Sequence, residues 1–325
     1  MKTAVISGIG SSLPEKVLTN QDLEKIVDTT DEWIRTRTGI RERRIAGDEP
    51  VSHYAIEASR RALADAGIGP GDLDLIIVAT VTPDRLVPAT ACFVQHKLGA
   101  GRVAAFDIQA GCSGFLYALQ VAKMGIVSGT YRNALVVGAE LLSKLTNWTD
   151  RTTCVLFADG AGAAIVTAGE APRGILSTRL YANGEMFDLI TIPAGGSERP
   201  ISVEGIQARE HLIRMKGNDV FKVAVRSIEE VSRQVLADEG LTPADVDLFV
   251  PHQANQRIID AVGARLEIGA DKVLANIERT GNTSAASIPI ALDEARREGR
   301  LKSGQLVLLA AFGAGLTWAA SLVRW

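Results

Sequence analysis

The 325-residue sequence predicts an α/β protein made of two similar halves, and three observations predict this fold class. Segments 62–76 and 235–249 carry the same residue type at eight aligned positions, all at an offset of 173. Both copies have the pattern of a helix end, a glycine cap, a Pro–Asp turn and an apolar strand. The strands of both halves are nearly continuous apolar runs, which is typical of sheets covered on both faces.

The elements after this repeat also correspond between the halves. Segment 103–119 aligns with 273–292, and segment 133–139 aligns with 304–310. We therefore expect an N-terminal half at residues 1–172 and a C-terminal half at residues 173–325. The least regular stretch, residues 182–209, contains several Gly and Pro residues and is expected to be a surface excursion early in the second half.

Composition excludes several classes of protein. The net charge of −3 argues against a nucleic-acid binder. The chain has no uninterrupted apolar run of about 18 residues, so we expect no membrane span. It also begins with a strand pattern rather than the apolar core of a signal peptide. Three cysteines without metal-type spacing favour a reducing cytoplasm and no metal site.

Cys112 lies where an apolar run becomes a helical pattern. Residues 103–106 predict a buried strand, a glycine-containing turn follows, and an apolar side made of Phe115, Leu116, Leu119 and Met124 predicts a helix. A helix N-terminus lowers the pKa of a thiol, so we expect thiolate character at Cys112. A single cysteine is nevertheless more often an inert core residue, and the other motifs must decide between the two.

Two further motifs occupy the same kind of position. His252 follows the apolar run 246–250 and precedes a helical pattern, and Asn282 follows the strand-like segment 273–277. Alone, each has an ordinary explanation, a hydrogen-bonded core histidine or a helix cap. The duplication, however, sets Cys112 opposite Asn282. We therefore predict that Cys112, His252 and Asn282 meet in one pocket between the halves.

These motifs resemble those of the β-ketoacyl-acyl carrier protein synthase III family of the thiolase superfamily. The resemblance runs from near Met1 to Trp325. It rests on AGCSGF around Cys112, PHQAN around His252, GNTSAASIP around Asn282, and the segments 30–44, 157–163 and 311–318. It implies a duplicated thiolase-like fold of five layers, αβαβα, usually in a homodimer.

The resemblance implies an initiating condensing enzyme of type II fatty-acid synthesis that needs no cofactor, because acyl-CoA is a substrate. Cys112 would take the acyl group from a short-chain acyl-CoA. Malonyl-acyl carrier protein would then lose CO2, and its enolate would attack the acyl-cysteine to give 3-oxoacyl-acyl carrier protein. His252 and Asn282 would donate to the malonyl thioester oxygen, and the backbone N–H groups of Cys112 and Ala314 to the acyl oxygen. Whether His252 is also the base for Cys112 stays open.

Binding roles follow from the same resemblance. The predicted CoA-binding residues are Trp33, Arg37, Arg151, Gly217, Phe221 and Asn255, since indole and guanidinium groups stack on purines and Arg pairs with phosphate. A basic patch of Lys222, Arg257 and Arg265 would steer the acidic carrier protein. Val87 would cap the acyl pocket of a partner subunit. A valine there leaves more room than an aromatic residue, so we expect branched or longer short-chain acyl-CoAs to be accepted besides acetyl-CoA.

Two alternatives remain at this point. A related condensing enzyme or acyltransferase of secondary metabolism, with another acceptor, would carry the same Cys–His–Asn set. A non-catalytic acyl-binding protein would keep the fold, although intact Cys112, His252 and Asn282 speak against it. Thiolases use a second cysteine, but Cys92 in a helical pattern and Cys154 in a strand pattern are both expected to be core residues.

Overall fold

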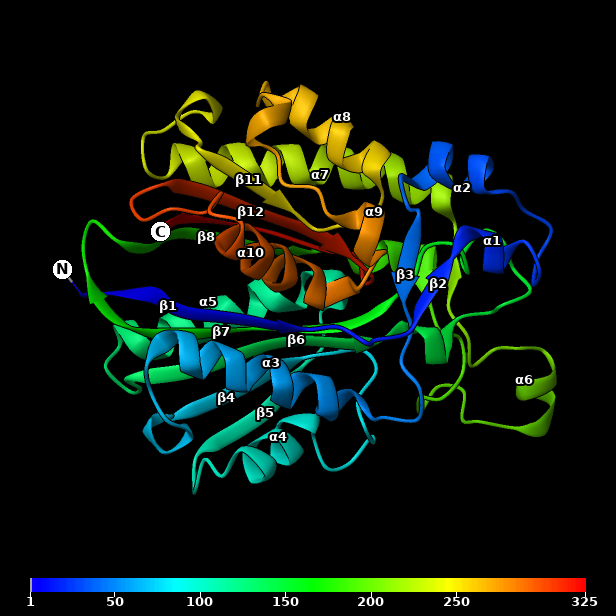
Figure 1. Cartoon of the computed structure of the whole chain (residues 1–325), viewed down its shortest axis with the longest axis horizontal. Helices are drawn as coiled ribbons and strands as arrows, with labels where there is room; N and C mark the ends of the chain where they lie inside the picture. Colours follow the sequence, from blue (N-terminus) through cyan, green and yellow to red (C-terminus); the bar gives the residue numbers. More distant parts are fainter. Residues whose placement is uncertain (1) are drawn as a thin grey trace.

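The computed structural model describes residues 2–325, and its elements follow one another in a strand–helix series (Figure 1). Up to residue 170 they are β1 (Lys2–Ser12), β2 (Val17–Thr19), α1 (Asn20–Leu23), α2 (Asp31–Thr38), β3 (Glu42–Arg44), α3 (Val51–Ala66), η1 (Pro70–Asp72), β4 (Leu75–Ala79), α4 (Thr90–Leu98), β5 (Ala104–Ile108), η2 (Gly111–Ser113), α5 (Gly114–Val127), β6 (Asn133–Leu141), η3 (Leu142–Leu145) and β7 (Asp159–Glu170), where η denotes a 3₁₀ helix.

The remaining elements begin at residue 174. They are β8 (Gly174–Ala182), η4 (Gly184–Leu189), β9 (Ile190–Thr191), α6 (Val203–Gln207), β10 (Arg214–Met215), α7 (Gly217–Ala237), η5 (Pro243–Asp245), β11 (Leu248–Pro251), α8 (Gln256–Leu266), η6 (Ala270–Lys272), α9 (Ile277–Thr280), η7 (Ser284–Ala286), α10 (Ser287–Arg297), β12 (Leu306–Gly313) and β13 (Thr317–Arg324). Among residues 2–325, no helix has both the length and the apolar character needed to cross a membrane.

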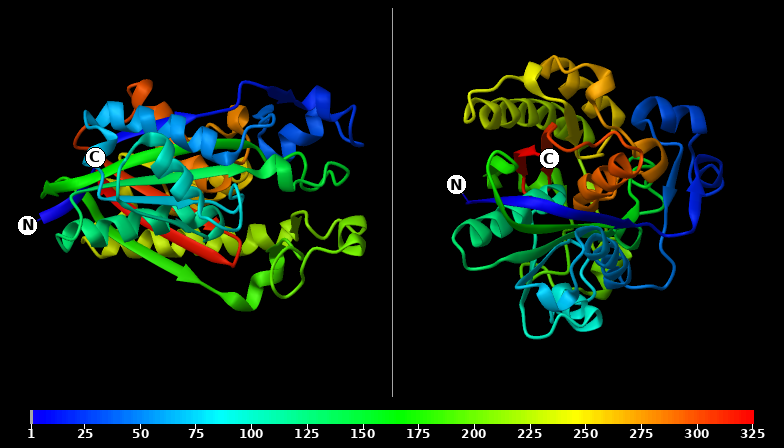
Figure 2. Two further views of the ribbon diagram at one scale, coloured as in Figure 1. Left: turned by 90° about the horizontal axis from the view of Figure 1, so that it is seen from below. Right: turned by 60° about the vertical axis from the view of Figure 1, so that its left-hand side comes forward.

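Two mixed sheets form the core. The first has the strand order β1-β7-β6-β4-β5, and the second has the order β11-β12-β13-β8. Helices α5 and α10 lie between the sheets, α3 and α4 cover the outer face of the first sheet, and α7 and α8 cover the second (Figures 1 and 2). Three buried apolar clusters fill the interfaces between these layers. The result is the five-layer αβαβα order that the sequence predicts.

The internal repeat is visible as a repeated structure. Helix α3, turn η1 and strand β4 follow one another as α7, η5 and β11 do. The glycine after each helix has a left-handed backbone, with φ 68° at Gly67 and 67° at Gly240, which explains why glycine recurs at both positions. Strands β6 and β12, which the alignment of 133–139 with 304–310 pairs, each lie next to the parallel strand of their own half.

The prediction of a strand at 273–277 is wrong. This segment is the counterpart of β5, but it forms only one isolated parallel bridge, between Val273 and Phe249. The N–H groups of Asn276 and Ile277 instead donate to the side chain of Gln253, at 2.9 and 3.2 Å. A buried amide side chain has thus replaced the neighbouring strand as hydrogen-bond partner.

Other local expectations also need correction. Strand β5 is not buried but lies at the edge of its sheet with only β4 as partner, and its Phe106 is 37 % exposed. Met124 on α5 is exposed as well. Cys92 is exposed on α4, whereas Cys154 is buried in a turn rather than a strand, because its N–H donates to the Asp150 carbonyl at 3.0 Å.

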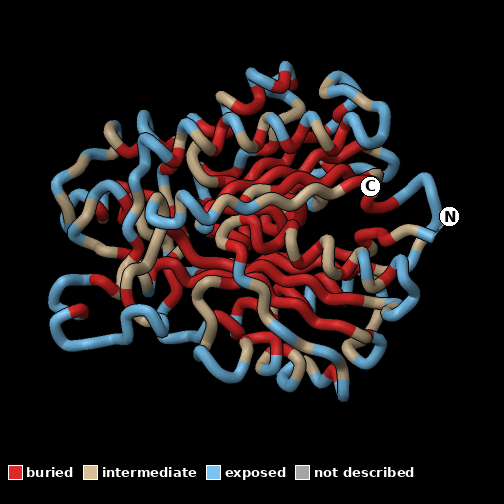
Figure 3. The backbone as a smooth tube through the Cα atoms, turned by 180° about the vertical axis from the view of Figure 1, so that it is seen from behind, coloured by how far each residue is buried: buried red, intermediate tan, exposed pale blue. Residues whose placement is uncertain are grey.

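The excursion expected at 182–209 is present and extends to residue 216. It contains only short elements, including α6, which projects away from the sheets (Figures 1 and 2). The tube coloured by burial shows this projection largely exposed, while the strands behind it are buried (Figure 3). Ile201, Val203 and Ile206 are large apolar side chains exposed on it.

Candidate active site

Cys112, His252 and Asn282 line one pocket of about 590 Å³. Each of these residues directly follows a strand or short helix or lies in the turn after one: Cys112 in η2 after β5, His252 directly after β11, and Asn282 after α9. The walls come from both parts of the chain, since α2 contributes Trp33 and α7 contributes Phe221. The pocket therefore brings together the three residues that the sequence singled out separately.

The Cys112 turn touches the turn after β12. A Cβ added at Gly111 would lie 2.7 Å from the backbone nitrogen of Ala314, and one added at Gly313 would collide with the backbone of Cys112. Both positions need glycine because two backbones meet there. The Ala314 N–H donates to no loop or turn carbonyl within residues 2–325, and Ala314 is not among the residues with positive φ. A second backbone donor thus lies next to that of Cys112.

The expected thiolate is not supported by the surroundings of Cys112. Cys112 is half-buried at the pocket, and burial raises the pKa of its thiol to about 12. The hydroxyl of Ser284 lowers this pKa, and the nearby carboxyl of Glu140 raises it. These surroundings favour the thiol over the thiolate that the helix terminus alone predicts.

His252 is neutral and its tautomer is set by its neighbours. Burial lowers the pKa of the imidazole to about 3. Its Nδ1 lies 2.7 Å from the hydroxyl of Ser287, which also accepts the Gln253 N–H at 3.3 Å. The Ser287 proton has no other acceptor among the described residues, so it points at Nδ1. Nε2 then carries the hydrogen and can donate to a ligand oxygen.

Asn282 is oriented by its own loop. Its Oδ1 accepts the N–H of Ser284 at 2.9 Å, and Ser284 has a left-handed backbone with φ 49°. The backbone of Asn282 pairs with the 156–158 segment through Leu156 O and Ala158 N, both at 2.9 Å. With the carbonyl oxygen occupied, the amide N–H₂ is the group left for the pocket.

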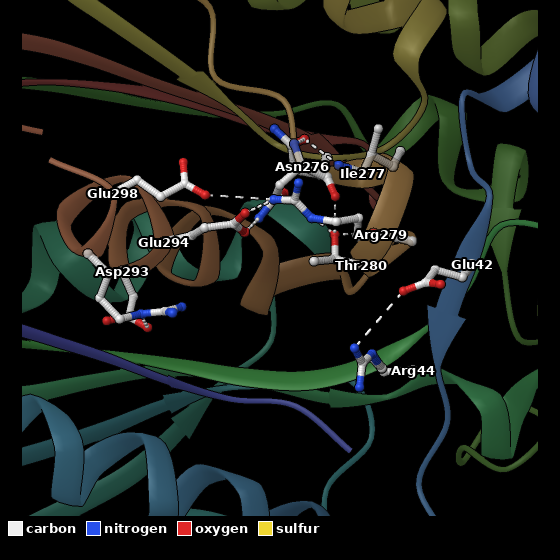
Figure 4. A network of polar contacts seen from close by, with 12 residues as sticks. Glu42, Arg44, Asn276, Ile277, Arg279, Thr280, Asp293, Glu294 and Glu298 are labelled. Atoms are coloured by element: carbon white, nitrogen blue, oxygen red, sulfur yellow. Dashed lines mark hydrogen bonds and ion pairs between the residues drawn. The ribbon is translucent and has the colours of Figure 1, made fainter. Parts of the chain in front are cut away.

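A polar network holds the short helix α9 that leads into Asn282 (Figure 4). Arg279 pairs with Glu294 on α10 and, at 3.9 Å, with Glu298 directly after that helix. Asn276 donates to Glu294 at 2.8 Å. On the other side Gln253, next to His252, accepts from the N–H groups of Asn276 and Ile277 and donates to two backbone carbonyls. One buried side chain thus ties the His252 and Asn282 segments together.

Replacing Gln253 by leucine is expected to lower the free energy of unfolding by about 2–4 kcal/mol, because buried backbone donors and acceptors lose their partner. Urea denaturation followed by circular dichroism measures the change. The matched control is Gln207→Leu at the exposed end of α6, which should change the free energy by less than about 0.5 kcal/mol. Equal effects of the two substitutions would contradict a tying role for Gln253.

The mouth of the pocket is lined by Trp33, Arg37, Gly217, Phe221, Lys222, Asn255 and Arg257 of the predicted set. The guanidinium of Arg151 lies 5.1 Å from the centre of the Trp33 ring, and that of Arg257 lies 5.3 Å from the Phe221 ring. These flat aromatic and guanidinium groups can stack on a purine or pair with phosphate. Asn255 lines the pocket, but its amide already caps α8 and donates to the Arg37 carbonyl at 3.0 Å.

Four predicted residues do not line this pocket. Arg151 contacts the Trp33 ring, and the backbone of Ala314 touches the Cys112 turn, whereas Arg265 and Val87 lie apart from it. Arg265 pairs with Glu229 at 2.9 Å on the α7–α8 surface, and Glu229 also pairs with Arg233 at 3.4 Å. Val87 is 82 % exposed and does not line the pocket of its own chain. The sequence reasoning missed Glu140, Gln253, Ser284 and Ser287. Ser284 and Ser287 stood within the GNTSAASIP motif, whereas no pattern marked Glu140, which ends a different strand. Within residues 2–325, no cluster of His, Cys, Asp or Glu is suited to hold a metal.

Two stacked sheets with a Cys–His–Asn pocket between them define a condensing enzyme with a thiolase-like fold. Family models of 3-oxoacyl-[acyl-carrier-protein] synthase III match residues 106–184 and, for the C-terminal part, 236–325. The chain belongs to this family.

Similar proteins cover the whole chain. The β-ketoacyl-[acyl-carrier-protein] synthase III of Caldanaerobacter subterraneus subsp. tengcongensis is 56% identical over 99% of this chain and 98% of that protein. The crystal structure of 3-oxoacyl-[acyl-carrier-protein] synthase III from Aquifex aeolicus is 53% identical, with a TM-score of 0.92 over 99% of this chain and 100% of that chain. The Pseudomonas aeruginosa structure is 41% identical, with a TM-score of 0.93 over 99% and 98%.

Proposed function

We propose that this protein starts fatty-acid chains, by moving a short acyl group from acyl-CoA to Cys112 and condensing it with malonyl-acyl carrier protein. The observation that supports this most is the convergence of one thiol and two oriented N–H donors in a single pocket. Acyl-CoA is a substrate here, and the reaction uses no resident cofactor. The product is 3-oxoacyl-acyl carrier protein.

Negative charge develops on a different oxygen in each of the two half-reactions. During acyl transfer, negative charge develops on the acyl oxygen, and the adjoining backbone N–H groups of Cys112 and Ala314 are the donors proposed for that oxygen. During decarboxylation, charge develops on the malonyl thioester oxygen. The Nε2–H of neutral His252 and the amide N–H₂ of Asn282 are the donors proposed for that oxygen. A neutral imidazole suits this role because it donates without first needing a proton.

Intact-protein mass spectrometry after mixing with acetyl-CoA tests the first half-reaction. We expect the mass of one acetyl group, about 42 Da, to be added at Cys112, in keeping with covalent catalysis by a nucleophilic cysteine. Adding malonyl-acyl carrier protein should then remove the label and yield 3-oxoacyl-acyl carrier protein. Label that forms on Cys112 but never turns over would contradict the proposal and favour a non-catalytic acyl-binding protein.

An enzyme of secondary metabolism with another acceptor would use the same pocket. The mouth favours an acidic carrier protein, since Arg37, Lys222 and Arg257 form no ion pair within residues 2–325. Such unbalanced cations attract an anionic partner and the phosphates of CoA. Arg265 is left out of this docking patch because it does not line the pocket and shares Glu229 with Arg233.

A homodimer of this chain is proposed from the edge of the first sheet. Strand β5 has a partner on one side only, and Phe106 on it is exposed. The nearby Leu86 and Val87 are 86 % and 82 % exposed, which is unusual for apolar side chains without a partner. Within each subunit, residues 1–172 and 173–325 are proposed as the two halves. All three cysteines are free thiols, as a reducing cytoplasm would keep them.

Replacing Val87 by phenylalanine is expected to narrow the acyl pocket of the partner subunit. The ratio of kcat/KM for acetyl-CoA to that for hexanoyl-CoA should rise about tenfold or more, because a pocket that loses a few methylenes of space rejects the longer chain. Measuring kcat/KM with acetyl-, isobutyryl- and hexanoyl-CoA checks this. A strict acetyl preference in the unchanged enzyme, or no change in the ratio, would contradict the role of Val87.

A further inference from the structure

A buried carboxyl group lies behind the nucleophile and has no part in the mechanism so far. Glu140 ends β6 and is fully buried, and within residues 2–325 it forms no ion pair. Its two oxygens are used unequally. Oε2 accepts from Val81 N at 3.1 Å and from the hydroxyls of Thr80 and Thr82 at 3.3 and 2.8 Å, whereas Oε1 accepts only from Ser284 Oγ at 3.1 Å.

Ser284 lies between this carboxyl group and the nucleophile. Its hydroxyl donates to Oε1 of Glu140 at 3.1 Å. Turn η7, which begins at Ser284, packs against η2, which carries Cys112, and against β6, which carries Glu140. The Ser284 hydroxyl also lowers the pKa of the Cys112 thiol. Ser284 reaches this position with a left-handed backbone, and such strain in a non-glycine residue is typical of functional sites.

We propose that Glu140 receives the proton of Cys112 through the Ser284 hydroxyl during acyl transfer. The Sγ–H bond breaks and a new O–H bond forms on Ser284, while the former Ser284 proton moves to Oε1 of Glu140. The electron pair stays on sulfur, which becomes the thiolate that attacks the thioester. Until the attack, protonated Glu140 donates to Ser284 and Ser284 donates to the thiolate. The attack forms the bond between the Cys112 sulfur and the acyl carbon and breaks the bond from that carbon to the CoA sulfur. CoA leaves as a thiolate, and the proton on Glu140 passes back through Ser284 to the CoA sulfur.

The alternative proton acceptor is weaker. Burial lowers the pKa of His252 to about 3, whereas burial raises the pKa of Glu140 to about 7, because its hydrogen bonds compensate only in part. A base poised near neutral pH is the better acceptor at that pH. The Nε2–H of His252, moreover, is already a donor. With Glu140 as the acceptor of the Cys112 proton, His252 and Asn282 act only in the malonyl half-reaction.

Other titratable groups near Glu140 accept hydrogen bonds from other parts of the chain. Cys112 on η2 lies close enough to Glu140 for the carboxyl group to raise the pKa of its thiol. Asp159 at the start of β7 accepts from Ala46 N and Ser143, and Asp107 on β5 accepts from the N–H groups of Thr90 and Ala91. An ionisation near neutral pH that affects acyl transfer therefore belongs to the Glu140–Cys112 pair.

The inference rests on the proposed function, and single-turnover acylation by acetyl-CoA at several pH values tests it. In the unchanged enzyme the acylation rate should rise with pH up to about 7, as Glu140 ionises, and then level off. Glu140→Gln and Ser284→Ala should each lower the rate at neutral pH by about 10²-fold and remove the inflection. The double variant should lose little more than either single variant. Glu140→Asp, which keeps a carboxylate, should keep the inflection.

The control is Asp107→Asn, which removes a half-buried carboxylate that does not touch Ser284 and should leave the acylation rate within about threefold. Condensation from preformed acetyl-enzyme should also change little in Glu140→Gln. An inflection that persists in Glu140→Gln overturns the inference. Acylation of Glu140→Gln at least as fast as that of the unchanged enzyme also overturns it. This second result is expected if the only effect of the Glu140 carboxylate is to repel a thiolate at Cys112. Failure of the proposed function would instead appear as no acylation in the unchanged enzyme.

Discussion

Replacing Cys112 by serine is expected to lower the rate of condensation by about 10⁴-fold or more, as removal of a covalent nucleophile does in other enzymes. A serine hydroxyl in this enclosed site is much harder to ionise than a thiol. Decarboxylation of malonyl-acyl carrier protein should persist within about tenfold, because the donors to its oxygen, His252 and Asn282, stay in place. Measuring CO2 release beside 3-oxoacyl product separates the two reactions.

The matched control is Cys92→Ser on α4, whose thiol is exposed and lies outside the pocket. It should leave both reactions unchanged. Loss of decarboxylation together with condensation in Cys112→Ser would contradict the assignment of separate donors to the two oxygens. Condensation at more than a tenth of the normal rate would contradict Cys112 as the nucleophile.

Replacing His252 or Asn282 by alanine is expected to slow decarboxylation but not acylation, the opposite of the effect of Cys112→Ser. Each substitution removes one donor to the malonyl thioester oxygen and should slow decarboxylation by about 10²–10³-fold. Acetyl labelling of Cys112 should stay within a few-fold of normal, because the backbone donors of Cys112 and Ala314 serve that step. The double variant should lose less than the product of the two effects, since both donors act on one oxygen.

The control for this pair is His96→Ala on the exposed face of α4, which should change neither rate. The result also bears on the base for Cys112. If His252→Ala slowed acetyl labelling as strongly as decarboxylation, His252 would be that base, and the route through Ser284 to Glu140 would be wrong.

Much of the fold could be predicted because its signals are local or repeated. The glycines at 67 and 240 mark helix ends whose left-handed backbone only glycine adopts easily. The repeat around them predicted two matching strand–helix halves. The same reasoning failed at 273–277, because whether an apolar run becomes a strand depends on a neighbouring strand. There the side chain of Gln253 had taken the hydrogen bonds.

The pocket was predicted in outline for a similar reason. Cys112, His252 and Asn282 each stand at an abrupt change of pattern, and the duplication predicted that two of them meet. Residues without such a marker, above all Glu140, were missed. The raised pKa of Cys112 was not predicted, because the helix terminus is a local feature whereas burial of the sulfur depends on the whole fold.

By itself, the sequence determined the order of helices and strands, the duplication and the identity of the reactive side chains, since periodicity, turn residues and motifs are properties of neighbouring positions. Only the tertiary structure decided the protonation of those side chains and their partners. Burial and hydrogen bonding depend on atoms far apart in the chain, as with Ser284 and Glu140, which are 144 residues apart yet share a hydrogen bond beside the nucleophile.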